Sequence, residues 1–409
     1  GRSLSSVLNT TIKTQTLTAG ATMVFNPTTN NDLRVNYSRN EGESFSTMDS
    51  FGGAIVPDVS TLFPSSVPIA DAHFILSLGP GNPSWFLGRL QTDSQRQINV
   101  VDTLSFVTSR HQFKFGVDYR RLFPEFDRVG YVQNPQFNSG VNGAVTGRAT
   151  RLTVQAFNGP RFPVFNNLSL FAQDNWRVTS RLLLTYGTRW ELNPAPSEST
   201  GKDPFAVTNF DNLATLAVAP AGTPMFKTRY NNFAPRVGVA YQISQEKGRE
   251  TVLRGGFGVF YDLGTGTIAS AFGISFPYFR QKVLTPVGGV PFPLDAATAA
   301  PPVFNPNPPY STLQGIVDPN FKLPYTYQWN VALERSLGFN QVVSASYVAA
   351  VGRRLTRQEL ITAPAPGFGN VFITRNSATS DYHALQVQLQ RRLFNGLQYV
   401  ASYTWSHSL

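Results

Sequence analysis

Apolar and polar residues alternate with a period of two in segment after segment of this sequence, and this alternation restricts the possible folds more than any other feature. The clearest example is NLSLFAQDNWRVTSRLLLTYGTRWEL, residues 167–192, which is interrupted by a short turn at 179–181. A period of two is typical of a β-strand, and two such runs joined by a tight turn indicate a β-hairpin. The stretch therefore predicts a hairpin with one apolar and one polar face.

Six hairpins of this kind can be read along the chain, which predicts twelve strands. A strand of about ten residues matches a tilted crossing of the hydrocarbon layer of a membrane. The predicted pairs are 17–25 with 32–39, 98–106 with 113–119, 167–178 with 182–192, 233–243 with 251–262, 327–337 with 341–348, and 384–393 with 397–406.

The connections between these strands are of two kinds. Those inside a hairpin are short, whereas those between hairpins are long: 40–95, 121–166, 193–232, 263–326 and 349–382. In an up-and-down sheet alternate connections lie at opposite ends, so all the short turns fall at one end and all the long loops at the other. Outer-membrane barrels have short periplasmic turns and long extracellular loops, whereas soluble sandwiches have no reason for this asymmetry. The sequence therefore predicts an all-β, antiparallel, up-and-down transmembrane barrel.

Composition narrows the possible chemistry. The 409 residues include no Cys, which excludes disulfides and thiolate metal sites, and only 14% are charged. The net charge is +10, but the basic residues are scattered and no nucleic-acid recognition motif accompanies them, so we expect no nucleic-acid partner. No apolar run reaches the 18 residues that a transmembrane helix needs.

The large aromatic residues favour lipid as the partner of the apolar faces. Trp and Tyr are placed near strand ends on these faces, as in the interfacial girdles of membrane barrels. The polar faces are rich in Gln, Asn, Ser, Gly and Arg and poor in Lys and Glu, unlike a solvated surface. The alternative is a soluble β-protein that packs its aromatic residues in a core. The predicted membrane-interface residues are Trp176, Trp190, Trp329, Tyr403 and Trp405.

Five runs in order along the chain resemble TonB-dependent outer-membrane receptors, specifically the Oar-like group. They are LSLFAQDNWRVTSRLLLTYGTRWEL, NNFAPRVGVAYQI, RGGFGVFYD, YQWNVALERSLGFNQVVSASYVAAVGRRL and YHALQVQLQRRLFNGLQYVASYTWSHSL. The resemblance implies a barrel of about 22 strands in the outer membrane of a Gram-negative bacterium. It also implies an N-terminal plug, energy supplied through the TonB complex, and import of a large or scarce ligand. The alternative function is a structural, adhesive or export-related surface barrel of the Oar-like group without ligand uptake.

The sequence departs from that family pattern in several ways. It shows no plug, no TonB box and no aromatic-ended terminal strand, and its twelve predicted strands are about half of such a barrel. We therefore expect residues 1–409 to be one partial barrel domain within a longer protein. The expected partners are outer-membrane lipid, the TonB complex through a plug region outside this sequence, and an unidentified ligand.

Few residues suggest chemistry. The four His, at 73, 111, 383 and 407, form no metal-binding motif, and RGGFGVF (254–260) lacks the Lys of a phosphate loop, so we expect no metal, no cofactor and no enzyme activity. Gly256 and Gly258 are predicted to make room on the inner face. We expect Asp118, Asp174, Glu191, Asp262 and Glu334 to lie on or near the polar faces, opposite arginines.

The long loops are the expected recognition elements. The candidate ligand-path residues in the lumen are Arg189, Arg236, Arg254 and Asp262.

Overall fold

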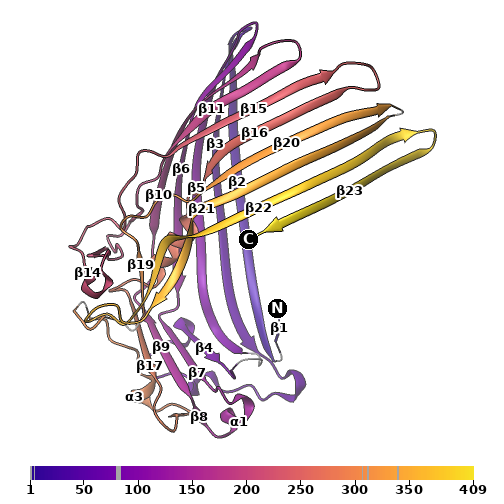
Figure 1. The fold of residues 1–409 in the computed structure, drawn as a ribbon. Helices are drawn as coiled ribbons and strands as arrows, with labels where there is room; N and C mark the ends of the chain where they lie inside the picture. Colours follow the sequence, from indigo (N-terminus) through magenta and orange to yellow (C-terminus); the bar gives the residue numbers. More distant parts are fainter. Residues whose placement is uncertain (1, 4, 80–83, 306, 311–312, 339) are drawn as a thin grey trace.

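Twelve long antiparallel strands dominate the computed structural model, which describes residues 2–3, 5–79, 84–305, 307–310, 313–338 and 340–409 (Figure 1). Each pairs with its neighbour along the chain, so the sheet is an up-and-down meander. The strands are β2 (Ser6–Asn26), β3 (Thr29–Met48), β5 (Trp85–Val107), β6 (His111–Arg128), β10 (Pro163–Arg177), β11 (Leu182–Leu192), β15 (Phe233–Ser244), β16 (Thr251–Tyr261), β20 (Tyr325–Gly338), β21 (Gln341–Ile361), β22 (Asn370–Phe394) and β23 (Leu397–Ser408).

The six predicted hairpins are confirmed by the pairing of the strands. In the hairpin of β10 and β11, Leu168 faces Leu192 and Trp176 faces Leu184 across the ladder, as the alternation requires. Figure 1 shows all the short turns at one end of the sheet and the folded loops at the other. Among the described residues β2 and β23 are not paired with each other, so the sheet stays open. The predicted fold class, a partial up-and-down barrel, is confirmed.

The strands are strongly staggered along the sheet. Phe113 lies two residues from the turn-side end of β6 at His111, whereas Trp329 lies nine residues before the turn-side end of β20 at Gly338. Both residues belong to one line of paired positions, so the strands must tilt relative to the barrel axis, as they do in every closed barrel. The line runs through Phe113, Asp174, Tyr186, Val237, Phe257 and Trp329.

Within the residues that the structure describes, no other element covers the middle of the apolar face of this sheet. Side chains at the middle of the strands are about half exposed, including Leu170 (47%), Val237 (51%) and Val331 (51%). A continuous exposed apolar surface of this extent marks a membrane or partner interface, not the outside of a soluble domain. The apolar residues of the strands are therefore not a soluble core, and the lipid interpretation accounts for their exposure.

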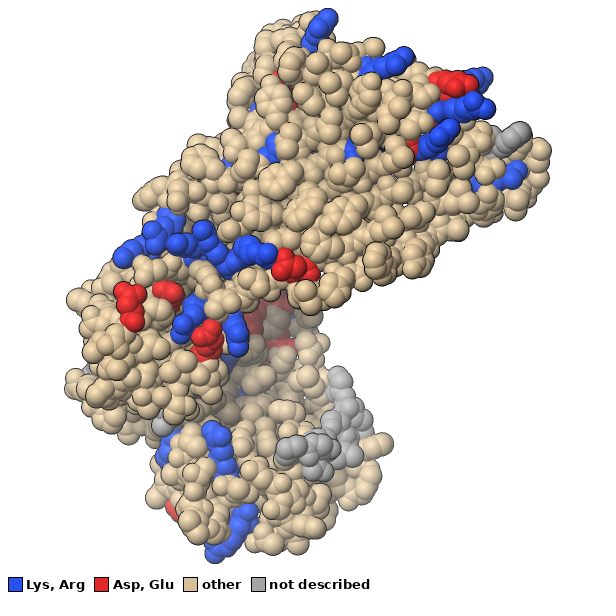
Figure 2. Space-filling view, viewed as in Figure 1, with Lys and Arg blue, Asp and Glu red and all other residues tan. Residues whose placement is uncertain are grey.

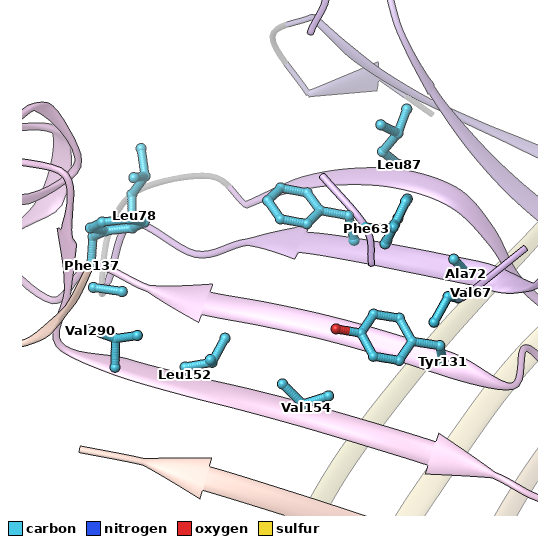
Figure 3. Packing of buried hydrophobic residues seen from close by; sticks show 12 residues of the cluster. Phe63, Val67, Ala72, Leu78, Leu87, Tyr131, Phe137, Leu152, Val154 and Val290 are labelled. Carbon is cyan, nitrogen blue, oxygen red and sulfur yellow. The ribbon is translucent and has the colours of Figure 1, made fainter. Parts of the chain in front are cut away.

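The buried apolar clusters lie in the loop region instead. The short strands β4 (Ala72–Leu76), β7 (Tyr131–Gln136), β9 (Arg151–Phe157) and β17 (Phe279–Leu284) form a small sheet that continues from the loop-side end of β5. Figure 3 shows Tyr131, Leu152 and Val154 projecting from one side of neighbouring strands into a cluster with Phe63 and Leu87. The opposite side carries Val132, Phe157 and Phe279 in a second cluster. Both faces of this small sheet are buried, so the loops form a packed module.

Three predicted loops are shorter than expected because strands continue beyond the alternating segments. The connection predicted at 349–382 is wrong in extent, since β21 runs to Ile361 and β22 starts at Asn370. Likewise β3 and β5 take up both ends of 40–95, and β6 runs to Arg128. These extensions stand above the membrane layer, where neither face has to be uniformly apolar, so their sequence does not alternate.

The remaining elements are short and belong to the connections. They are β1 (Arg2–Ser3), β8 (Arg148–Ala149), β12 (Ser197–Glu198), β13 (Val207–Thr208), β14 (Ala217–Val218), β18 (Val290–Pro291), β19 (Leu313–Val317), α1 (Gly140–Val145), α2 (Thr265–Gly273), α3 (Ala296–Ala299) and 3-10 turns at Phe51–Gly53, Val59–Thr61, Ile69–Asp71 and Leu213–Thr215. No helix among the described residues is long and apolar enough to cross a membrane.

Candidate functional site

A charged network lies on the polar face of the sheet, where the loop-side end of β11 pairs with the middle of β10 and, through β10, reaches the middle of β6. Arg189 Nη2 donates to Asp118 Oδ2 at 2.8 Å and to Ser169 Oγ at 2.6 Å, and its Nε donates to Glu191 Oε1 at 2.5 Å. Ser169 Oγ in turn donates to Glu191 Oε2 at 2.5 Å. Asp118, Ser169 and Glu191 share one register position on three adjacent strands, so the alternation brings them together. One guanidinium thus joins two carboxylates across the barrel wall.

The network borders a small polar cavity of about 180 Å³. This volume accommodates several water molecules or a small polar group. The carboxylates on its wall are already paired with Arg189, so the wall is close to charge balance and presents polar surface without a strong field. The lining residues are Asp118, Arg120, Asn167, Ser169, Arg189, Glu191, Tyr261 and Leu263.

Arg236 lies farther along the same face and is held by an aromatic ring. Its guanidinium carbon is 4.4 Å from the centroid of the Phe260 ring, a cation–π distance. Gly258 makes this possible, because a Cβ at this position would meet both the Phe260 ring and the stem of Arg236. Gly256 is on the same face, where a Cβ would meet Asn330. The prediction that these glycines make room on the inner face is confirmed.

The other two candidate lumen residues are placed elsewhere. Arg254 pairs with Glu334 at 3.4 Å near the short-turn end, and both side chains are about half exposed. Asp262 follows the last residue of β16, and its Oδ1 accepts a hydrogen bond from Gly264 N at 3.1 Å, which shapes the turn into α2. The structure therefore brings Arg189 and Arg236 onto one stretch of wall but does not place Arg254 or Asp262 beside them.

A loop element covers the outer end of the polar face. The helix α2 buries Ile268, Ala269 and Phe272 against Leu122 and Phe165 of the sheet wall. A cavity of about 410 Å³ remains between this helix and the wall formed by β2, β3, β5 and β6. Its lining combines apolar residues with carboxylates, namely Glu41, Asp93 and Glu125. The part of the connection around α2 thus packs inward over the polar face.

The predicted membrane-interface aromatics all lie on the apolar face. Trp176 is beside the short turn, and Trp190 is at the loop end, where its Nε1 donates to Tyr230 O at 2.7 Å. Trp329 packs edge-on against His383, with ring centroids 5.9 Å apart. Tyr403 and Trp405, on the edge strand β23, are 65% and 69% exposed.

Sequence reasoning missed a polar cluster on the apolar face. Asp174 does not lie on the polar face as expected, because it is in register with Phe113 and Tyr186. Its Oδ2 accepts from Tyr186 Oη at 2.8 Å and lies 2.7 Å from His111 Nδ1. His111 stacks between Phe113 and Trp176, both with centroids 5.4 Å away. The alternation itself could have placed Asp174 on the apolar face, since it lies two residues before Trp176 in the apolar run.

The other three histidines lie on the apolar face or in the loop module. His383 Nδ1 is 2.8 Å from Tyr347 Oη on the apolar face, and His407 is paired with His383 in the ladder and exposed. His73 is buried in the loop module, where desolvation lowers the pKa of its imidazole. The part of the chain that the structure describes contains no group of three or more His, Cys, Asp or Glu able to hold a metal ion.

The loop module also buries ionisable groups that are satisfied by backbone atoms. Lys282 Nζ donates to Thr298 O at 2.8 Å and to Ala300 O at 3.0 Å, while burial lowers the pKa of its ammonium group. Tyr131 Oη donates to Ala299 O at 2.7 Å, and burial raises the pKa of its phenol. These bonds tie the segment around α3 to the small sheet and rigidify the module.

Comparisons with known proteins agree with this geometry. A family model described as "Outer membrane beta barrel domain" matches residues 4–409. The fold is similar to the outer membrane transporter YddB from Escherichia coli, with a TM-score of 0.55, 13% identity, and coverage of 97% of this chain and 42% of that one. It is also similar to the copper transporter OprC, with a TM-score of 0.52, 12% identity, and coverage of 98% and 47%. The chain thus spans less than half the length of either structure. No curated protein matches the sequence.

Proposed function

Because this chain belongs to the family of outer-membrane β-barrel domains, and so lies in the outer membrane, we propose that it forms part of the barrel of a TonB-dependent transporter. The resemblance to outer-membrane receptors is confirmed at the level of the family, whereas membership of the Oar-like group stays a prediction. The two structures of similar fold are themselves described as transporters.

The observation that carries the proposal is the folded loop over a polar wall. The connection 263–324 buries α2 against the inner wall, and below it Arg189 and Arg236 line the same face. A barrel that only anchors an adhesive surface does not need an ordered loop packed into its lumen. A transporter does, because binding loops on a rigid wall capture a ligand before it passes inward.

Import and adhesion can be separated by their energy requirement. We would delete the gene for the full-length protein and compare growth on a panel of scarce nutrients: ferric chelates, copper, cobalamin, oligosaccharides and peptides. A transporter gives a growth defect on one of them, which loss of TonB reproduces and which a variant lacking 265–273 also shows. Normal growth on the whole panel with a TonB-independent loss of surface attachment would instead establish the adhesive alternative.

A further inference from the structure

Basic side chains form a row at the waist of the molecule, between the membrane-spanning strands and the loop module. Figure 2 shows this row of Lys and Arg running across one face, directly below the wide, sparsely charged surface of the strands. The residues that we assign to this basic row come from the loop before β15, the loop before β20 and the loop-side part of β21. They are Lys227, Lys322, Arg353, Arg354 and Arg357.

Hydrogen bonds to backbone atoms hold the separate segments of the basic row together. Asn376 Nδ2 donates to Lys322 O at 2.9 Å and to Arg354 O at 2.6 Å, and its Oδ1 accepts from Lys322 N at 2.7 Å. Lys227 N donates to Pro319 O at 3.1 Å, which fixes the loop before β15 next to the loop that carries Lys322. The fold therefore fixes the positions of the segments that carry the basic row.

Much of the positive charge in the basic row is unbalanced. Arg353 pairs with Asp381 at 2.9 Å. Lys227, Lys322 and Arg354 are exposed, and within the described parts of the chain no carboxylate lies at ion-pair distance from them. Arg354 lies over the ring of Tyr325, with its guanidinium carbon 5.2 Å from the centroid. Its planar donors therefore remain available to an anion at the surface.

The height of the basic row coincides with the outer boundary of the membrane. Strand β20 crosses from the short turn at Gly338 to Tyr325 in 14 residues. With a rise of about 3.3 Å per residue and a tilt of about 45°, it covers roughly 30 Å along the membrane normal, which is the thickness of the hydrocarbon. The outer face of this span carries Leu333, Val331 and Trp329, and then Tyr325 paired with Arg353.

We propose that the basic row binds the phosphate groups of lipid headgroups in the outer leaflet. A lipid fits better than a soluble anion because the cations lie directly beyond aromatic rings and the exposed apolar wall. The phosphate of such a lipid meets Lys227, Lys322 and Arg354, while its acyl chains lie on the wall below. Arg354 supplies parallel N–H donors that suit phosphate oxygens, and the lysines supply point charges.

The test uses the full-length protein in detergent, with native mass spectrometry to count retained phosphatidylglycerol and lipid A against phosphatidylcholine. The variant Lys227→Gln/Lys322→Gln/Arg354→Gln removes three charges at the basic row. The matched control Arg181→Gln/Lys247→Gln/Arg249→Gln removes three exposed charges at the opposite, short-turn end. A heat-dependent shift on SDS gels verifies that each barrel is folded, and the single variant Lys322→Gln serves if the triple variant does not fold.

The expected result is that the wild type retains the phosphate-bearing lipids and that each lost cation lowers retention about fivefold, with the control unchanged. Equal retention by the triple variant and the wild type would overturn the proposal. So would an equal loss in both triple variants, which would indicate a general effect of net charge. Displacement of the lipid by inorganic phosphate alone would also overturn it, because the site would then recognise a free anion.

Discussion

At the scale of single residues, Arg189 supplies the clearest prediction, because it bonds Asp118, Ser169 and Glu191 at once and is largely buried in the barrel wall. Arg189→Met leaves two carboxylates without their cation, and we expect it to lower the free energy of unfolding by about 2 kcal/mol. Urea unfolding in lipid vesicles measures this. The variant Arg189→Met/Asp118→Asn/Glu191→Gln removes the charges as well, and should recover most of the loss. No recovery would mean that the contacts of the Arg189 stem, not its charge, stabilise the wall.

His73 makes a prediction about acid. Its ring is buried and stacks on Phe86, and its Nδ1 lies 3.4 Å from Gly88 O. Burial lowers the pKa of the imidazole. Above the ordinary pKa, about 6.5, both folded and unfolded states are neutral, so the residue contributes no pH dependence. Below it only the unfolded segment gains a proton, so stability falls with pH until the lowered folded pKa is passed.

The measurement for His73 is hydrogen exchange of β4, corrected for intrinsic rates, at about pH 7.5 and about pH 5.5. We expect protection of this strand to fall on acidification in the wild type and to stay constant in His73→Phe. The exposed His407→Gln should behave as the wild type does. If His73→Phe loses protection in acid as well, another group controls the opening of the module.

Residue-scale features were unevenly predictable from the sequence. The inner-face position of Gly258 followed from alternation alone. That this glycine leaves room for the guanidinium of Arg236 to stack on the Phe260 ring could be seen only in the structure. Asp174 was misplaced because its residue type, not its position, was used to assign a face. Its partners His111 and Tyr186 come from adjacent strands, and no single stretch of sequence contains all three.

At the scale of elements, α2 packs the loops against the wall formed by the strands. Phe272 is 1% exposed in the cluster that also contains Phe226 and Phe321, whose centroids are 5.3 Å apart. We expect Phe272→Ala to destabilise this packing by about 3–5 kcal/mol and to open the connection 263–324 to proteolysis, while the heat-dependent gel shift stays intact. Val303→Ala, a change at an 84% exposed site in the same connection, is the control. Loss of the gel shift would mean that α2 also stabilises the strands.

The strands that alternate were predicted, and those that do not were missed. Alternation is imposed only where one face meets lipid and the other the lumen, so the segment Leu397–Ser408 was readable, whereas Asn370–Ser380 was not. The small sheet of β4, β7, β9 and β17 was missed for a related reason. Both of its faces are buried, and such strands have no period of two.

At the scale of the whole molecule, the apolar residues are divided between two environments. In the loop module they are buried in clusters, as in a soluble domain, whereas on the strands they stay exposed on one face. The same types of apolar residue are thus found in two surroundings: packed in cores where the loops meet water, and exposed on the strands where the sheet meets lipid. This is why total hydrophobicity says little about the fold, and why the position of each apolar residue in the alternation says much.

This division predicts opposite effects for two neighbouring residues at the middle of β20. Val331 is on the outer face, with six residues before it in the strand and seven after it, and Asn330 is on the inner face, where its Oδ1 lies near Gly256. An arginine on the lipid side at this depth costs about 2–4 kcal/mol, whereas one in the lumen is tolerated. We therefore expect Val331→Arg to lower the urea midpoint of the full-length protein in vesicles and Asn330→Arg to leave it nearly unchanged. If Asn330→Arg were the damaging change, the polar face would be the one that meets lipid; equal damage would mean that both faces are packed, as in a soluble sandwich. Because both variants carry the same new side chain one residue apart, only the face that it enters distinguishes them.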